Sequence, residues 1–347
     1  MLKTRPRPSA LAPLLLAGAI LPACRSATPA PTAEPAEPIA FPDTVTIDNG
    51  LVRLGVSPAV GRVVDFGPSG GEDLIWTADV DLYDNPILGQ DGQRYFNLGG
   101  DKLWIAPQPL WRNATGNDNW PPDGVIDGSP WTLLDHDPDQ HTLSIQSPVS
   151  PHYGVVVRRD FQLTPGRAEA VVTNTVRRVE ANPHPVQVWS VTQIVPPDVA
   201  VLDAAADRPA VIDPWFLMSN DPAKTDGLVD PLGDADNPDA SAWRQTGDAF
   251  AKIGSLGRWA AAVYDAPDGG GLVFRQSTAY DPQGAYPEAS SVQVYRASDY
   301  IELELLSPLV QLTEGEELTN TVTWQLRQTG TGGRTAALGA LLADDPR

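Results

Sequence analysis

Two glutamates near the carboxyl end of the chain, Glu302 and Glu304, have the spacing that most directly suggests proton-transfer chemistry. They alternate with aliphatic residues in the segment 300–309, and successive side chains of a β-strand point to opposite faces. Both carboxylates are therefore expected on one solvent-reached face, with Cβ atoms roughly 6.5 to 7 Å apart. Like charges at that separation raise the pKa of at least one carboxyl, which suits a general base or a proton-sharing ligand contact.

Glu304 and Glu302 are therefore the candidate catalytic residues. Of the two, Glu304 is expected to be the deeper, because it lies nearer the middle of the apolar run. The alternative is a solvated edge strand whose acidic side chains only discourage pairing with another strand.

A second group of candidates lies between residues 95 and 131, a segment that holds four of the ten tryptophans among many Asn, Asp, Gly and Pro residues. This composition favours turns over regular strand, and a tryptophan in a turn is hard to bury on all sides. Gly99 and Gly100 let the backbone approach a ligand or a neighbouring strand, and two opposite charges follow them. The predicted ligand-binding residues are Asp101, Lys102, Trp104, Trp111 and Gln193.

An indole ring beside paired polar groups suits the chemistry of a sugar. The C–H face of a sugar stacks on a flat apolar ring while its hydroxyls form hydrogen bonds, and a tryptophan offers both such a ring and one N–H donor. Lys102 is predicted to donate to a hydroxyl or a carboxylate of the ligand. The alternative is that these tryptophans only fill the end of a β-sandwich core.

The elements that must position these residues are antiparallel strands throughout the body of the chain. The clearest is a hairpin over 153–180, in which apolar and polar residues alternate on either side of a Thr-Pro-Gly turn. A last long strand over 319–328 is predicted to turn Val322, Trp324 and Leu326 inward. Further strands are expected at 52–56, 61–66, 141–146, 187–194, 259–264 and 271–275. The Ala- and Leu-rich segment 335–343 predicts a short helix, and the Asp-rich segment 219–241 predicts a solvated insertion.

Residues 1–24 resemble a bacterial lipoprotein signal peptide. Basic residues precede an apolar run at 11–21 that is too short to span a bilayer, and the run is followed by Cys24, the only cysteine of the chain. The resemblance implies that Cys24 is lipidated and anchors the protein in the bacterial cell envelope, with Arg25 suggesting the outer membrane. The alternative is an ordinary secretory signal cut near Ala23. Residues 25–42, rich in Pro and Ala, predict an extended tether, followed by one β domain over 43–328 and a tail with the short helix over 329–347.

The composition limits the partners of the protein. The formal net charge is −20, and such a surface repels nucleic acid and anionic lipid and favours neutral or cationic partners. The single cysteine excludes a disulfide within the chain and a thiolate metal site. No nucleophile motif, phosphate loop or metal-ligand cluster stands out, so no cofactor and no metal are expected. The expected ligand is a carbohydrate, the expected membrane contact is the lipid anchor alone, and the protein is expected to be a monomer.

Three short motifs together resemble the galactose mutarotase-like superfamily, which contains the aldose 1-epimerases. They are Gly61-Arg62-Val63-Val64, the hairpin Phe161-Gln162-Leu163-Thr164-Pro165-Gly166, and Tyr300-Ile301-Glu302-Leu303-Glu304-Leu305-Leu306. With the segment GGDKLWIAP at 99–107, the chain also resembles an uncharacterised bacterial family of that superfamily. The resemblance spans residues 43–328 and implies an all-β fold, an antiparallel β-supersandwich of two large sheets with a carbohydrate cleft on the concave face.

In this superfamily a glutamate base takes the proton of the anomeric hydroxyl and a histidine acid protonates the ring oxygen. The glutamate position corresponds to Glu302 and Glu304, but the histidine positions fall in 97–100 and 185–193, which contain no histidine. We therefore predict a lipid-anchored envelope protein that binds carbohydrate without turnover. One alternative is an enzyme on a sugar or uronate, an aldose 1-epimerase-like isomerase that pairs a glutamate base with Lys102, Tyr95 or Asp101. The other is a structural module of the envelope.

Overall fold

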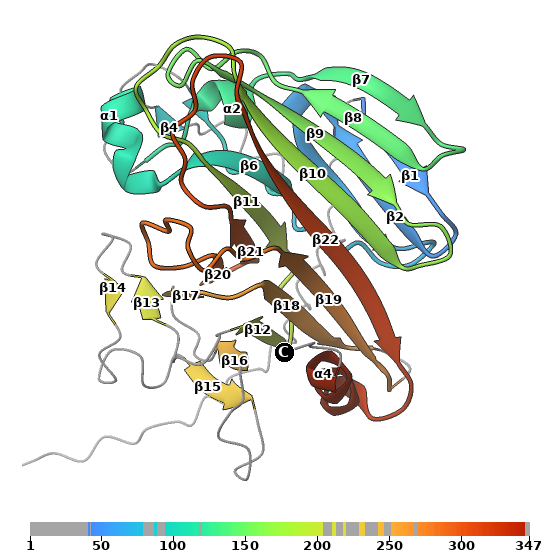
Figure 1. Cartoon of the computed structure of the whole chain (residues 1–347). Helices are drawn as coiled ribbons and strands as arrows, with labels where there is room; N and C mark the ends of the chain where they lie inside the picture. Colours follow the sequence, from blue (N-terminus) through green and yellow to red (C-terminus); the bar gives the residue numbers. More distant parts are fainter. Residues whose placement is uncertain are drawn as a thin grey trace, which may run out of the picture. The chain divides into compact units, whose positions relative to one another are not determined.

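Two large antiparallel sheets make up most of the computed structural model (Figure 1). The structure describes residues 41, 43–78, 87–88, 94–117, 120–203, 210–212, 218–219, 229–232, 242–245, 251–266 and 269–343. These residues all belong to one compact unit of the chain, residues 39–347. The described strands are antiparallel throughout, so the predicted all-β, two-sheet architecture is confirmed.

The first sheet has ten strands within the described residues. In spatial order they are β1 (Val45–Asp48), β2 (Val52–Ser57), β3 (Arg62–Pro68), β6 (Asp101–Ala106), β11 (Gln187–Ile194), β21 (Ile301–Leu306), β20 (Val292–Arg296), β17 (Ala251–Ser255), β13 (Ala210–Ile212) and β14 (Met218–Ser219). Its central strands therefore come from segments that lie up to two hundred residues apart in the chain.

The second sheet also has ten described strands and lies in front of the first in Figure 1. In spatial order they are β15 (Val229–Leu232), β16 (Ala242–Gln245), β12 (Val199–Asp203), β18 (Trp259–Asp265), β19 (Gly271–Thr278), β22 (Glu317–Thr329), β10 (Glu169–Arg178), β9 (Val155–Leu163), β8 (Thr142–Gln146) and β7 (Thr132–Asp137). A small hairpin pairs β4 (Ile87–Leu88) with β5 (Arg94–Tyr95), and the described helices are η1 (Pro58–Val60), η3 (Gln108–Leu110), α1 (Trp111–Thr115), α2 (Gly124–Gly128) and α4 (Gly333–Ala343).

Side-chain alternation along the strands builds the core between the sheets. The predicted hairpin is β9 paired with β10, and β22 turns Val322, Trp324 and Leu326 into the core as predicted. On the first sheet the aliphatic residues Leu303 and Leu305 of β21 belong to the same core. The alternation of an antiparallel strand with one buried face thus assigns each side chain to a face.

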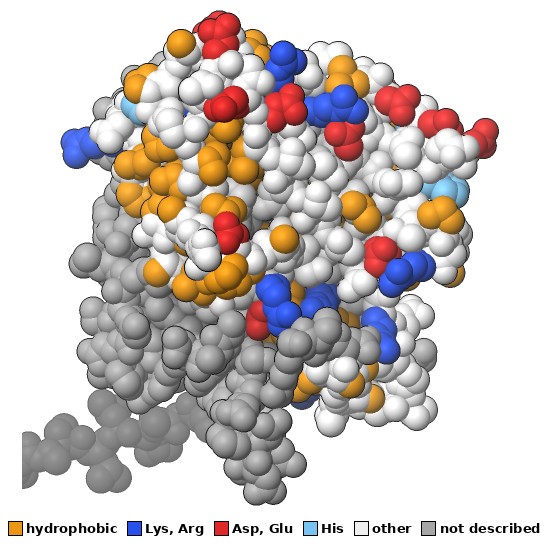
Figure 2. Space-filling view, viewed as in Figure 1, with side chains coloured by type: hydrophobic (Ala, Val, Ile, Leu, Met, Phe, Trp, Pro, Cys, Tyr) orange, Lys and Arg blue, Asp and Glu red, His pale blue; other side chains and the backbone are white. Residues whose placement is uncertain are grey.

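The outer face of the second sheet is polar around β10 and β22. The threonine pairs Thr173–Thr321 and Thr175–Thr319 lie opposite each other there, and Figure 2 shows few hydrophobic side chains in this region. Further along the sheet the predicted carboxy-terminal helix, α4, packs Ala337 against the cluster that contains buried Trp259. No helix among the described residues is long and apolar enough to cross a membrane.

One local expectation is wrong, and a second is contradicted only where a strand forms. The segment 101–106, predicted to lie in turns, is β6 near the middle of the first sheet, because the turn is made just before it by Gly99 and Gly100 at φ +80° and +82°. From there the chain alternates regularly, and packing on both faces outweighs turn propensity. In the predicted insertion, residues 229–232 form β15; most of the remainder of 219–241 lies outside the described residues, as do the proposed signal peptide and most of the tether.

Candidate functional site

The outer face of the first sheet, which is turned away from the second sheet, carries a polar cluster on β6, β11, β21, β20 and β17. Cross-strand pairing aligns these side chains in rows. The central row consists of Lys102, Val191, Glu304 and Gln293, which are consecutive cross-strand partners. The row on one side of it consists of Trp104, Trp189 and Leu306, and the row on the other side consists of Gln193, Glu302, Tyr295 and Lys252. The strands thus bring together two glutamates, two lysines and two glutamines.

Glu304 lies at the centre of this cluster and is fully buried. Its Oε2 accepts a hydrogen bond from the indole Nε1 of Trp189 at 2.7 Å and forms an ion pair with Nζ of Lys252 at 2.8 Å. Burial raises the pKa of Glu304 to about 7; Lys252 opposes this shift and the nearby Glu302 adds to it. The other oxygen, Oε1, is buried without a hydrogen-bond partner.

Glu302 belongs to a chain of hydrogen bonds that leads toward the edge of the cluster. Nε2 of Gln193 donates to Oε1 of Glu302 at 2.8 Å and to Oδ1 of Asn97 at 3.0 Å, and Asn97 donates in turn to the hydroxyl of Tyr300. The Oε1 atom of Gln193 is buried and has no partner. Gln193 is therefore held by two bonds with one acceptor atom unused.

The predicted placement of the two glutamates holds in part. Both lie on the outer face, and Glu304 is the deeper, at 0% exposure against 7% for Glu302. The carboxylates are buried, however, and not solvent-reached as expected. The reason is that the long side chains of Trp189, Lys252 and Gln193 lie directly against them.

Lys102 is a buried cation whose Nζ has no hydrogen-bond partner. Burial lowers its pKa to about 8, and the charge of Glu302 is the largest influence in the opposite direction. Its Nζ lies 5.0 Å from the ring centroid of Trp104, and Lys252 Nζ lies 4.3 Å from the ring centroid of Trp189. Each ammonium is therefore placed over an indole face, where the ring quadrupole attracts it.

The tryptophans predicted to line an open cleft form a packed aromatic cluster beside the central row. Trp104 contacts Trp111 and Trp189 edge-on, with ring centroids 5.8 and 5.1 Å apart. Trp104 is 3% exposed and Trp111 is 1% exposed, so the expectation that such residues are hard to bury is wrong for both. Trp120, which packs on Trp104, is 39% exposed, and Figure 2 shows hydrophobic side chains gathered around the region where Figure 1 places α1.

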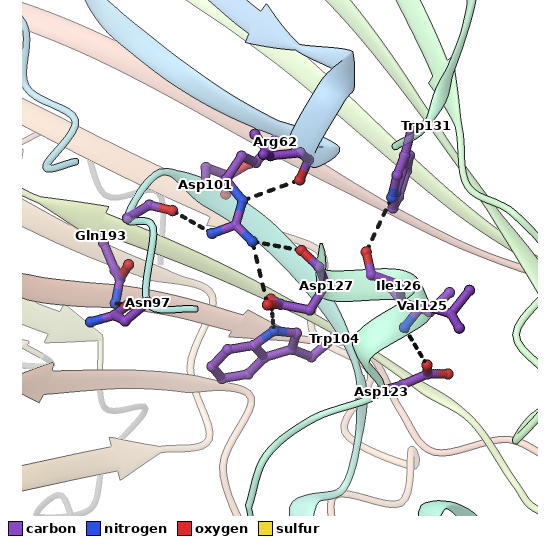
Figure 3. Close-up of polar contacts among 12 residues, drawn as sticks. Arg62, Asn97, Asp101, Trp104, Asp123, Val125, Ile126, Asp127, Trp131 and Gln193 are labelled. Atoms are coloured by element: carbon purple, nitrogen blue, oxygen red, sulfur yellow. Dashed lines mark hydrogen bonds and ion pairs between the residues drawn. The ribbon is translucent and has the colours of Figure 1, made fainter. Parts of the chain in front are cut away.

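An ion pair fixes Trp104 from the side of α2 (Figure 3). The indole Nε1 of Trp104 donates to Oδ1 of Asp127 at 2.6 Å, and Asp127 is paired with the buried Arg62 at 3.4 Å. The guanidinium of Arg62 also donates to the carbonyl oxygens of Gly99 and Asp127. A side chain at Gly99 would collide with the backbone of Trp76. The turn before β6 and the helix α2 are thus tied to the same indole.

Asp101 lies on the opposite face of β6 from Lys102, in the space between the sheets. Its carboxylate forms a fully buried ion pair with Arg159 and accepts a hydrogen bond from Thr192 Oγ1 at 2.7 Å. The prediction that Asp101 acts in the site together with Lys102 is therefore corrected. Consecutive residues of a strand point to opposite faces, whereas the composition of this segment predicts a turn, in which the two side chains could lie side by side.

Replacing Trp104 by Phe should lower the free energy of unfolding by about 1 to 3 kcal/mol, because the buried Asp127 loses a donor. The ring that remains keeps most of the apolar contact. The matched change is Trp120→Phe, at the partly exposed member of the cluster, for which we expect a smaller loss. Denaturant unfolding of the two variants gives the comparison, and equal losses would contradict the role given to the Trp104–Asp127 bond.

The sequence alone does not identify Lys252, Trp189 and Gln293 as members of the cluster, nor Glu288, which accepts a hydrogen bond from Gln293. Trp189 and Gln293 lie on β11 and β20, which pair with β21, and Lys252 lies on β17, which pairs with β20. Nothing in the sequence gives this spatial order of the strands. For Trp189 the sequence does contain a signal. Trp189 and Gln193 are four residues apart in β11, so their side chains lie on the same face of the strand. Within the described residues, no group of three or more His, Cys, Asp and Glu side chains is arranged to hold a metal ion.

A family model described as a domain of unknown function, DUF4380, matches residues 43–327. The chain belongs to the DUF4380 family. Among curated proteins, none matches it. The DUF4380 model covers the two sheets together with the outer-face cluster, including both glutamates and both lysines.

Several solved structures with a similar fold are described as galactose mutarotase-like or as related enzymes. One from Clostridium acetobutylicum, described as galactose mutarotase-like, has a TM-score of 0.53 at 12% identity, covering 82% of this chain and 95% of its own. A GalM/aldose epimerase homologue from C. elegans has a TM-score of 0.51 at 11% identity, covering 83% and 99%. A galactose mutarotase related enzyme from Lactobacillus acidophilus has a TM-score of 0.50 at 11% identity, covering 83% and 98%. This DUF4380 protein therefore has a galactose mutarotase-like β-sandwich fold.

Proposed function

We propose that this protein binds a carbohydrate on the outer face of β6, β11, β21 and β20. The observation that supports the proposal is a set of buried polar atoms without hydrogen-bond partners: Lys102 Nζ, Gln193 Oε1, Glu304 Oε1 and Gln293 Oε1. An unsatisfied buried polar atom costs about 1 to 3 kcal/mol, so a site that retains several of them is suited to a ligand that satisfies them.

The mixture of groups favours a ligand with several hydroxyls. Lys102 can only donate, whereas the glutamine carbonyl oxygens can only accept. A hydroxyl does both, so hydroxyls at different positions of one sugar can accept from Lys102 and donate to Gln193 and Glu304. The similarity in fold to proteins described as galactose mutarotase-like supports the same class of ligand.

Calorimetric titration of the purified protein with a panel of neutral and charged monosaccharides tests the proposal. We expect saturable binding of at least one member. Binding should weaken in Gln193→Leu, which removes one of the unpartnered acceptors, and persist in Glu314→Gln, at an exposed position. If no sugar binds and the purified protein captures only protein components of an envelope extract, the alternative of a structural module of the envelope replaces the proposal of carbohydrate binding.

A second candidate function, isomerisation of a sugar, is favoured by the pKa values of two side chains. The pKa of Glu304 is raised to about 7 and that of Lys102 is lowered to about 8, and a general base or acid works best when its pKa lies near the working pH. In such a reaction Glu304 would take the proton of the anomeric hydroxyl and Lys102 would protonate the ring oxygen, in the place of the family's histidine.

Anomer interconversion of a bound sugar, followed by NMR or polarimetry, decides between binding and turnover. If Glu304 is the base, Glu304→Gln should slow interconversion by about 10²- to 10⁴-fold while the fold survives. A rate with the wild-type protein no higher than that in buffer would leave binding as the function.

We also propose that the protein is anchored to the bacterial envelope by lipid at Cys24, which lies outside the described residues. The support is the sole cysteine placed directly after a signal-like apolar run. Cys24→Ala should move the protein from the membrane fraction to the soluble fraction. Failure of a labelled fatty acid to appear on the wild-type protein in its bacterial host would refute the anchor.

A further inference from the structure

Three of the unpartnered oxygens belong to neighbouring side chains at the β20 side of the outer face. They are Oε1 of Glu288, Oε1 of Gln293 and Oε1 of Glu304. The three side chains are 6%, 0% and 0% exposed, respectively. Gln293 and Glu304 are direct cross-strand partners, which places their Cβ atoms about 5 Å apart, and Glu288 is bonded to Gln293.

The second polar atom of each side chain is already engaged, so the three free oxygens are fixed in place. Nε2 of Gln293 donates to Oε2 of Glu288 at 2.8 Å and to Oγ of Ser290 at 2.6 Å. Oε2 of Glu304 accepts a hydrogen bond from the indole of Trp189 and forms the ion pair with Lys252. Both N–H groups of the Gln293 amide are thus used, and none is left for the free oxygen of Glu288 or of Glu304. When the carboxyls are ionised, all three free oxygens can only accept.

The charge balance of the face is acidic on this side. Among the described side chains of this face, the three carboxyl groups of Glu288, Glu302 and Glu304 face only two ammonium groups, those of Lys102 and Lys252. The charge of Arg62 is already balanced by its ion pair with Asp127. The whole chain carries a formal net charge of −20, so a positively charged ligand is attracted at long range as well. A hydroxyl supplies one donor and no charge; a primary ammonium supplies three donors and one positive charge.

From these contacts we infer that the carbohydrate bound here is an amino sugar, whose free ammonium donates to Glu288, Gln293 and Glu304. The inference rests on the proposed function and names its ligand class. Lys102, two strands away from Glu304 in the central row and about 9.5 Å from it at the backbone, takes an oxygen at the other end of the sugar. Val191, which lies between them in the row, has an aliphatic side chain and adds no polar group of its own.

Three ligands that differ at one carbon test the inference: glucose, glucosamine and N-acetylglucosamine, with the corresponding galactose series alongside. At pH 7 we expect the free amino sugar of at least one series to bind about tenfold or more tightly than its parent, because its hydrogen bonds are charge-assisted. The acetylated form, which has no charge and one N–H, should lose that advantage.

Glu288→Gln is the matched variant. It keeps the shape of the side chain and an oxygen that can accept the hydrogen bond from Gln293, and it removes one negative charge. The preference for the amino sugar should fall severalfold in Glu288→Gln and stay unchanged in Glu314→Gln, at an exposed position. Equal or tighter binding of the parent or acetylated sugar overturns the inference and leaves the proposed function standing. Absence of binding by all six sugars overturns the inference, and absence of binding across the whole monosaccharide panel overturns the proposed function as well.

Discussion

Replacing Asp101 by Asn should lower the free energy of unfolding by about 3 to 5 kcal/mol, while replacing its neighbour Lys102 by Met should leave stability unchanged or raised. Asp101 and Arg159 are both fully buried, so the Asn variant leaves an uncompensated guanidinium between the sheets. Lys102 Nζ has no hydrogen-bond partner, so its removal leaves no polar group unpaired. Burial already lowers the pKa of Lys102, which means that its positive charge is unfavourable at this position.

Ligand affinity should respond in the opposite way. Lys102→Met removes a donor from the outer face, so sugar binding should weaken by about tenfold, whereas folded Asp101→Asn protein should bind as wild type does. Denaturant unfolding and calorimetric titration of both variants measure the two effects. Loss of affinity in folded Asp101→Asn protein, with full affinity in Lys102→Met, would place the site on the other face of β6.

The fold could be predicted because burial on one face imposes a period of two. In β9 and β22 apolar residues alternate with polar ones, and the structure turns the apolar set inward. The same rule assigned Glu302 and Glu304 to one face. It failed for Asp101 and Lys102 because glycines and prolines nearby suggested turns, and a strand was not considered.

The cluster around Glu304 could not be predicted, because it depends on the order of strands in the sheet. Lys252 and Trp189 reach Glu304 from β17 and β11, and neither sequence neighbourhood marks them as its partners. Burial of the carboxylates was equally out of reach, since it follows from which long side chains lie beside them. Sequence parity gives the face of a residue, but packing decides whether water reaches it.

Lysine usage gives a signal that was available in the sequence. The chain has 24 lysines and arginines, of which only Lys3, Lys102, Lys224 and Lys252 are lysines. Two of these four lie on the outer face, each over an indole ring. An arginine stays charged in a protein, whereas a buried lysine can lose its proton. A chain that otherwise uses arginine has thus placed a lysine whose pKa is lowered, Lys102, in the same row as Glu304.

Glu304 should make the stability of the fold depend on pH. Its pKa is raised from 4.5 to about 7 in the folded protein, so between these values the folded state holds a proton that the unfolded chain releases. Stability therefore falls as pH rises through this window and changes no further above it. A shift of this size corresponds to a loss on the order of 3 kcal/mol.

The measurement is the difference in unfolding free energy between wild type and Glu304→Gln, taken at pH 5 and again at pH 8. Other groups with raised pKa values, such as Asp73 and Asp123, are present in both proteins and cancel in the difference. The wild type should lose a few kcal/mol relative to the variant between the two pH values. A difference that stays constant would mean that Glu304 is ionised in the folded protein throughout this range, held so by Lys252 and Trp189. That result would remove the raised pKa as support for Glu304 as a general base, because a base works best when its pKa lies near the working pH.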